Sequence, residues 1–107
     1  MSGYISVSSE KEWQATSWMF RFVATFIADN AESNGLASQI NEMIEYNLPY
    51  FLELDILSAS DRDTVLKILR DDVVRHAEAS LNQSLPNRQS AIDHIRELAQ
   101  LARSVPA

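Results

Sequence analysis

Hydrophobic residues recur at helical spacing over most of the chain. The segment WMFRFVATFIA carries two neighbouring rows of large apolar side chains, namely Trp18, Phe22 and Phe26 in one row and Met19, Val23 and Ile27 in the other. Two adjacent rows make a broad apolar face, which is typical of a central amphipathic helix. Ser9 and Glu12 have the spacing of a capping box, so the pattern predicts that this helix begins near Ser9.

The same spacing predicts three further helices, at residues 36 to 48, 60 to 81 and 86 to 103. The first of these ends at Leu48, because the residue before a proline is disfavoured in helical geometry. The long helix begins with a second capping box, formed by Ser60 and Asp63. The last helix begins near Pro86, since proline is well tolerated in the first helical turn.

Residues 49 to 57 fit two structures. Leu52, Leu54 and Ile56 alternate with Glu53 and Asp55, as in a strand that is buried on one face. Proline at the start of the segment equally suits the first position of a short helix. We favour the short helix, because a lone strand would have no obvious partner. The only other strand-like segment is YISV, at residues 4 to 7, and it is too short to decide the matter.

These elements predict an all-α fold, a small bundle of four to five helices in one domain that spans residues 1–107. The length of 107 residues suits a single compact core. Hydrophobic residues make up 46% of the chain, and only two glycines and three prolines interrupt regular structure, so an ordered globular domain is expected. Residues 1–8 are expected to be an extended or flexible N-terminus.

The charge is negative overall and unevenly distributed. A net charge of −6 argues against binding to nucleic acid or to anionic membranes, because Lys and Arg contacts to phosphate supply most of that affinity. From Phe22 to Asp61 the chain has no Lys or Arg. The acids in this stretch are Asp29, Glu32, Glu42, Glu45, Glu53, Asp55 and Asp61. Such a run attracts a basic partner or simply solvates one face of the protein.

Catalytic and metal-binding patterns are absent from the sequence. The chain has no cysteine, and its two histidines, His76 and His94, lie outside any recognisable motif. We therefore predict no metal, no cofactor and no enzymatic activity. An enzyme that uses His76 or His94 remains an alternative. No secretory signal or membrane-spanning apolar run is visible, which favours a cytoplasmic location.

The segment EYNLPYFLELD, at residues 45 to 55, combines aromatic rings with unpaired acids and contains no basic residue. An exposed aromatic anchor inside an acidic collar is typical of a surface that binds a basic protein. The predicted partner-binding residues are Glu42, Glu45, Tyr46, Tyr50, Phe51, Glu53 and Asp55. The alternative is that these aromatic rings complete a small core.

We expect a small acidic module that neutralises a basic protein partner by occlusion. The chain resembles in kind the nuclease-blocking immunity proteins and antitoxins, which are typically small, acidic and cysteine-free, although no shared motif places it in a named family. The alternative function is a helical bundle that self-associates through apolar surface left on its first helix, as a structural or regulatory subunit. A monomer and a homodimer are both compatible with the sequence.

Overall fold

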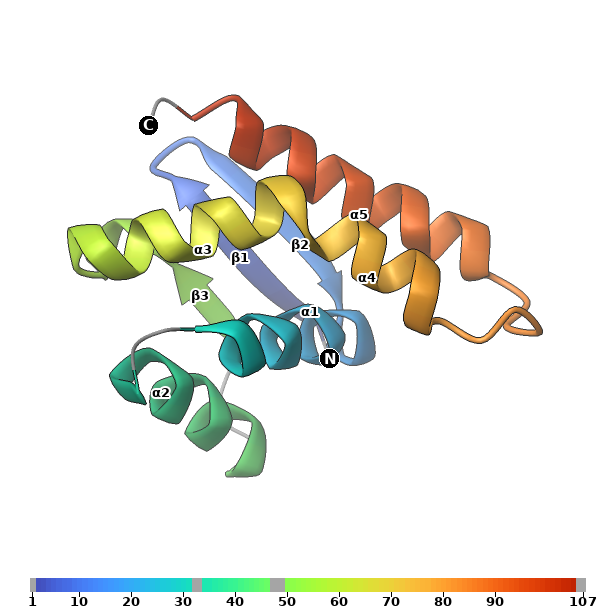
Figure 1. Cartoon of the computed structure of the whole chain (residues 1–107), viewed down its shortest axis with the longest axis horizontal. Coiled ribbons are helices and arrows are strands. Elements are labelled where there is room, and N and C mark those ends of the chain that lie inside the picture. The colour runs from blue at the N-terminus through green and yellow to red at the C-terminus, as the bar shows by residue number, and fades with distance from the viewer. Residues whose placement is uncertain (1, 32–33, 47–49, 106–107) are drawn as a thin grey trace.

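A computed structural model describes residues 2–31, 34–46 and 50–105. Its elements in chain order are β1 (Ser2–Ser8), β2 (Lys11–Thr16), α1 (Ser17–Asn30), α2 (Asn34–Glu45), β3 (Phe51–Glu53), the short 3-10 helix η1 (Leu54–Ile56), α3 (Ala59–Asp71), α4 (Val73–Ser80) and α5 (Arg88–Arg103). Figure 1 shows these helices and strands along the chain. The predicted all-α bundle is therefore wrong, because the protein has a mixed α/β fold.

The three strands form one mixed sheet in the order β2-β1-β3. Strand β1 lies in the centre and pairs antiparallel with β2, so that Tyr4 is opposite Gln14. On its other side β1 pairs in parallel with β3, and Tyr4 is opposite Phe51. The N-terminal residues, for which an extended or flexible segment is predicted from the sequence, thus form the central strand.

Alternation of side chains explains why residues 2 to 16 form a hairpin instead of the start of a helix. In β1 and β2 every second residue is buried, namely Gly3, Ile5, Val7, Trp13 and Ala15. This period of two buries one face of a sheet, whereas a helix would scatter the same residues around its axis. Ser9 lies in the turn between the strands, and helix α1 begins at Ser17. The capping box predicted at Ser9 and Glu12 is therefore wrong.

Residues 51 to 56 contain both of the structures that their sequence allows. Phe51–Glu53 form strand β3, and Leu54–Ile56 form η1. The short helix is favoured from the sequence because no partner strand is visible there. In the structure β1, which is distant in sequence, is the partner of β3. Leu48 and Pro49, on which the predicted helix boundary rests, lie outside the described residues.

The long helix predicted at residues 60 to 81 is divided into α3 and α4, which meet at Asp72. Its N-terminal cap is Ser58, whose hydroxyl oxygen accepts the backbone N–H of Asp61 at 3.2 Å, and not Ser60. The helices predicted near residues 36 to 48 and 86 to 103 are present as α2 and α5.

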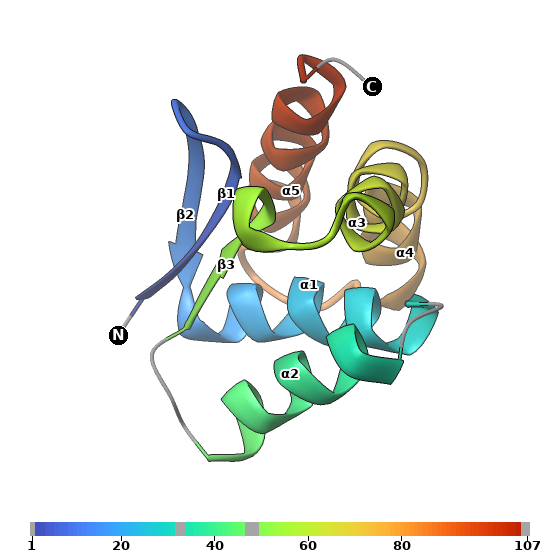
Figure 2. The ribbon, with the colours of Figure 1, turned by 90° about the vertical axis from the view of Figure 1, so that its left-hand side faces the viewer.

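The helices α1, α3 and α5 lie on the same side of the sheet and enclose the core. Figure 2 shows the sheet nearly edge-on, with these helices beside one of its faces. From α1 the core receives Met19, Val23 and Ile27, as the sequence predicted. The neighbouring row on α1 differs, because Trp18 is 41% exposed. None of the described helices is both long and apolar enough to cross a membrane.

Gly3 allows close packing between β1 and α1. A Cβ atom at this position would lie 2.7 Å from the ring of Phe20, which is fully buried. We therefore expect Gly3→Ala to lower the free energy of unfolding by about 1–3 kcal/mol, the usual cost of overpacking a core. Chemical denaturation measures this change. Ser6→Ala, on the opposite face of the same strand, is the control, and an equal loss in both variants would contradict the packing explanation.

Candidate functional site

One face of the sheet packs on the helices, and the other carries polar and aromatic side chains. The strand pairing brings Tyr4, Ser6, Glu12, Gln14, Phe51 and Glu53 onto that second face. We call these six residues the open sheet face. In Figure 2 no described helix lies against this side of the sheet. The open sheet face is therefore a surface built on three strands and available to a partner.

Tyr4 is the centre of the open sheet face. Its hydroxyl donates a hydrogen bond to Glu53 Oε1 at 3.1 Å. Its ring stacks on the ring of Phe51, with 5.9 Å between the ring centroids and 21° between the planes. Phe51 is 38% exposed. Two aromatic rings and a carboxylate thus form one connected group on neighbouring strands.

The open sheet face contains carboxylates and no basic side chain. Glu12 adds a second carboxylate from β2, close enough for its charge to act on the Tyr4 hydroxyl. The nearest basic residue in the sequence, Lys11, is turned towards the C-terminal end of α5. Its Nζ atom donates to the hydroxyl oxygen of Ser104 at 2.8 Å and to the Ser104 carbonyl oxygen at 3.1 Å. The negative potential of the open sheet face is therefore not neutralised from within it.

These neighbours change the acidity of Tyr4. The hydrogen bond to Glu53 raises the pKa of Tyr4 above its ordinary value of 10.0, and removal of water and the charges of Glu53 and Glu12 raise it further. The pKa of Tyr4 is raised in the folded state, so the hydrogen bond between Tyr4 and Glu53 contributes to stability at neutral pH. That contribution is lost as the pH rises through the raised pKa.

We expect Glu53→Gln to bring the pKa of Tyr4 back towards 10, because the negative acceptor is removed. Ultraviolet absorbance of the phenolate during an alkaline titration reports this change, with Tyr4→Phe to assign the signal. Asp63→Asn, on α3, removes an exposed carboxylate elsewhere and is the control. A Tyr4 titration that is the same in Glu53→Gln and in the wild-type protein would contradict the hydrogen bond.

Two of the predicted site residues, Phe51 and Glu53, belong to the open sheet face, but Tyr50 does not. Tyr50 is only 8% exposed, and its ring stacks on Phe20 at 5.3 Å between centroids with 13° between the planes. Neighbouring residues of a strand point to opposite faces, so Tyr50 and Phe51 cannot both be exposed. The prediction that Tyr50 is an exposed partner-binding anchor is wrong, because Tyr50 is a core residue.

The other predicted site residues lie on different elements. Glu42, Glu45 and Tyr46 are exposed at the C-terminal end of α2, and Tyr46 is 67% exposed. Asp55 is exposed on η1. Figure 2 shows α2 packed below α1, away from the outer side of the sheet. Glu42 and Glu45 thus belong to a different element from Phe51 and Glu53, and Tyr46 lies in the turn that follows α2. Glu32 lies outside the described residues.

Sequence reasoning missed Tyr4 and Glu12, which the hairpin and the parallel pairing bring next to Phe51 and Glu53. The alternation of polar and apolar residues in SGYISVS and KEWQAT could have indicated them. It predicts two strands and places Tyr4 and Glu12 on their polar side.

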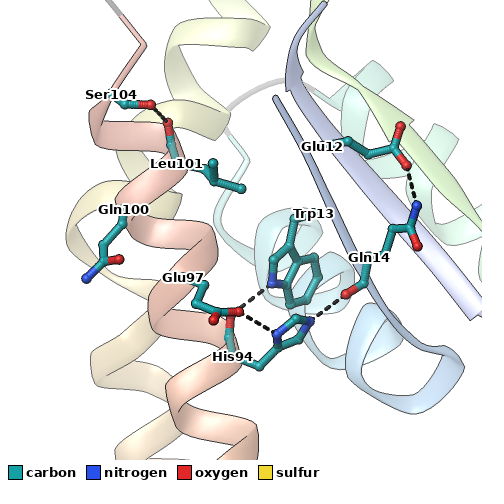
Figure 3. Close-up of a pocket in the computed structure, with 8 residues that line it drawn as sticks. All are labelled: Glu12, Trp13, Gln14, His94, Glu97, Gln100, Leu101 and Ser104. Carbon is teal, nitrogen blue, oxygen red and sulfur yellow. Dashed lines mark hydrogen bonds and ion pairs between the residues drawn. The ribbon is translucent and has the colours of Figure 1, made fainter. Parts of the chain in front are cut away.

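His94 lies in an open hollow of about 610 Å³ between β2 and α5 (Figure 3). Its Nδ1 atom contacts Glu97 Oε2 at 2.8 Å, and its Nε2 atom contacts the carbonyl oxygen of Gln14. The ring also stacks on Trp13, whose indole N–H donates to the His94 carbonyl oxygen at 2.9 Å. Each ring nitrogen lies against an oxygen atom, one on α5 and one on β2, so the His94 side chain links β2 to α5.

His76 is also held by packing. Its ring stacks on Phe26 at 4.1 Å and on Phe22 at 5.1 Å, and its Nδ1 atom lies 3.2 Å from the hydroxyl oxygen of Ser80. Within the described part of the chain, no group of three or more His, Asp or Glu side chains could hold a metal ion. Both histidine rings are held in place by aromatic stacking, and the open sheet face is taken as the candidate site.

Comparison of the chain with protein-family models, with curated proteins and with solved structures finds no match. The chemistry of the open sheet face is therefore the basis for a proposed function.

Proposed function

We propose that this protein is a binding module that neutralises a basic protein partner through the open sheet face. The observation that carries the proposal is the group formed by Tyr4, Phe51 and Glu53, with Glu12 beside it and no basic side chain on the same face. In this proposal the protein acts in the cytoplasm as an immunity protein or antitoxin does, by covering a functional surface of its partner.

The aromatic rings supply the contact area of the proposed interface. Tyr and Phe bury a large apolar area while losing little side-chain entropy, and such residues dominate the binding energy when they lie at the centre of an interface. Phe51 is already fixed by stacking on Tyr4, and Tyr4 is fixed by its hydrogen bond to Glu53. Because the rings are held in place before binding, little ordering is needed when the partner arrives.

The carboxylates supply attraction and selectivity. A negative surface speeds encounter with a positively charged protein and disfavours acidic proteins. Carboxylates on a rigid sheet can also occupy the positions at which a nuclease holds phosphate groups, because Lys and Arg side chains pair with both. Occlusion of a phosphate-binding surface is therefore the proposed mechanism of neutralisation.

A short lysine- and arginine-rich peptide tests the proposal. We expect the wild-type protein to bind the peptide more weakly as salt rises, because screening weakens the attraction between exposed charges. Phe51→Ala is expected to weaken binding by about 10-fold, since it removes the exposed ring of the open sheet face. Isothermal titration calorimetry at two salt concentrations measures both effects.

Tyr46→Ala is the matched control for this experiment, because it removes an exposed ring from the turn that follows α2. We expect its affinity for the peptide to equal that of the wild-type protein. Absence of binding at low salt, or a larger loss in Tyr46→Ala than in Phe51→Ala, would contradict the proposed site.

A further inference from the structure

A second surface of the molecule lies between α1 and α4, apart from the open sheet face. A hollow of about 620 Å³ is lined by Trp18, Arg21, Phe22, Thr25, Phe26 and Asp29 of α1, by His76 of α4 and by part of the α4–α5 connection. A second hollow of about 400 Å³ adjoins it at Phe26 and His76 and extends to Asn30 and Arg75. Together the two hollows form a groove along α1, which we call the α1–α4 groove.

The exposed stripe of α1 beside this groove has a self-complementary charge pattern. Arg21 and Asp29 are exposed, and each lies one helical turn from Thr25, on opposite sides of it. Among the described residues, neither side chain has an ion-pair or hydrogen-bond partner within the chain. The cation and the anion are too far apart on the helix to pair with each other, because they are separated by about 12 Å.

We infer that the α1–α4 groove binds a second copy of this chain, with the two α1 helices antiparallel and crossing at Thr25. In such a two-fold arrangement each residue contacts its counterpart reciprocally. Arg21 of one copy then lies beside Asp29 of the other, and the same pair forms again on the other side of the axis. The unpaired charges of the single chain thereby become two equivalent ion pairs.

The exposed position of Trp18 also supports this arrangement. It is the only tryptophan of the described chain that is exposed, and it stands at the N-terminal end of the stripe. An antiparallel partner carries its own Trp18 towards the opposite end of the groove, where the smaller hollow is lined by Phe26, Asn30 and Arg75. An indole ring packs well on an aromatic ring and a guanidinium group. Each copy therefore offers both a projecting ring and a hollow for the ring of its partner.

Charge reversal tests the reciprocal pairing directly. Arg21→Glu places a carboxylate against Asp29 of the second copy, and Asp29→Arg places two cations together. We expect each variant to raise the dimer dissociation constant by about 100-fold, because like charges at an interface are strongly unfavourable. Analytical ultracentrifugation over a range of concentrations measures the dissociation constant, and circular dichroism confirms that each exposed substitution leaves the fold intact.

Mixing the two variants distinguishes this arrangement from any other dimer. In the mixed pair, the carboxylate introduced by Arg21→Glu in one chain faces the guanidinium group introduced by Asp29→Arg in the other. At the second contact the unchanged Asp29 faces the unchanged Arg21, so opposite charges meet at both contacts. We expect the equimolar mixture to dimerise as the wild-type protein does. We expect the same of the double variant Arg21→Glu/Asp29→Arg.

A wild-type protein that stays monomeric at millimolar concentration would overturn the inference. A dimer that both single variants retain, or single-variant monomers that do not associate when mixed, would overturn it equally. The proposed function at the open sheet face does not depend on the result. The variants that test peptide binding are changed at Glu12, Phe51 and Glu53, and none of these residues lies on α1.

Discussion

Replacement of Tyr50 by alanine is expected to lower the free energy of unfolding by about 3–5 kcal/mol, the range found for large aromatic residues removed from a core. The ring is almost fully buried and stacks on Phe20 of α1. The backbone next to it joins the sheet, because the Tyr50 carbonyl oxygen accepts the N–H of Tyr4 at 3.1 Å. The loss of the ring leaves a cavity between β3 and α1.

Denaturation with urea measures this effect, and Tyr50→Phe is the control that keeps the ring. We expect Tyr50→Phe to be much less destabilising than Tyr50→Ala, because only the hydroxyl group is removed. If Tyr50→Ala were as stable as the wild-type protein and bound a basic peptide less well, Tyr50 would be an exposed anchor after all.

The largest expected effect on binding comes from reversing the two charges of the open sheet face. Glu12→Lys/Glu53→Lys replaces both carboxylates beside the Tyr4 and Phe51 rings with cations. We expect the double variant to lose at least about 100-fold in affinity for the lysine- and arginine-rich peptide, because attraction becomes repulsion at the centre of the surface. Calorimetry at low salt measures this loss.

Asp63→Lys/Asp71→Lys makes the same change of net charge at two exposed positions of α3, and is the matched control. If binding depended only on the total charge of the protein, the two double variants would lose affinity equally, and this result would contradict a localised site. A larger loss in the control would place the binding surface on the helical side of the molecule.

The approximate positions of the helices could be predicted from local patterns, and the pairing of the strands could not. The core row of Met19, Val23 and Ile27 follows from spacing within a single helix. The sheet depends on pairs that are distant in sequence, such as Tyr4 with Phe51. The spacing of Ser9 and Glu12 also matched a capping box, so a local helix signal competed with the alternation of the true strands.

Only two of the six residues of the open sheet face, Phe51 and Glu53, are among those predicted from the sequence. Phe51 and Glu53 belong to one acidic and aromatic segment, and that composition predicts a binding surface. Tyr4 and Glu12 come from other strands and join them only through the sheet register. The direction of each side chain depends on strand parity, which places Tyr50 in the core and Phe51 on the surface.

Nuclear magnetic resonance mapping of the peptide complex tests the central claim most directly. In a titration of the labelled protein with the lysine- and arginine-rich peptide, we expect the largest chemical-shift changes at Tyr4, Glu12, Phe51 and Glu53, and none of comparable size on α3 or at Tyr46. Changes that are centred on α2, or spread evenly over all exposed acids, would contradict a binding site on the open sheet face.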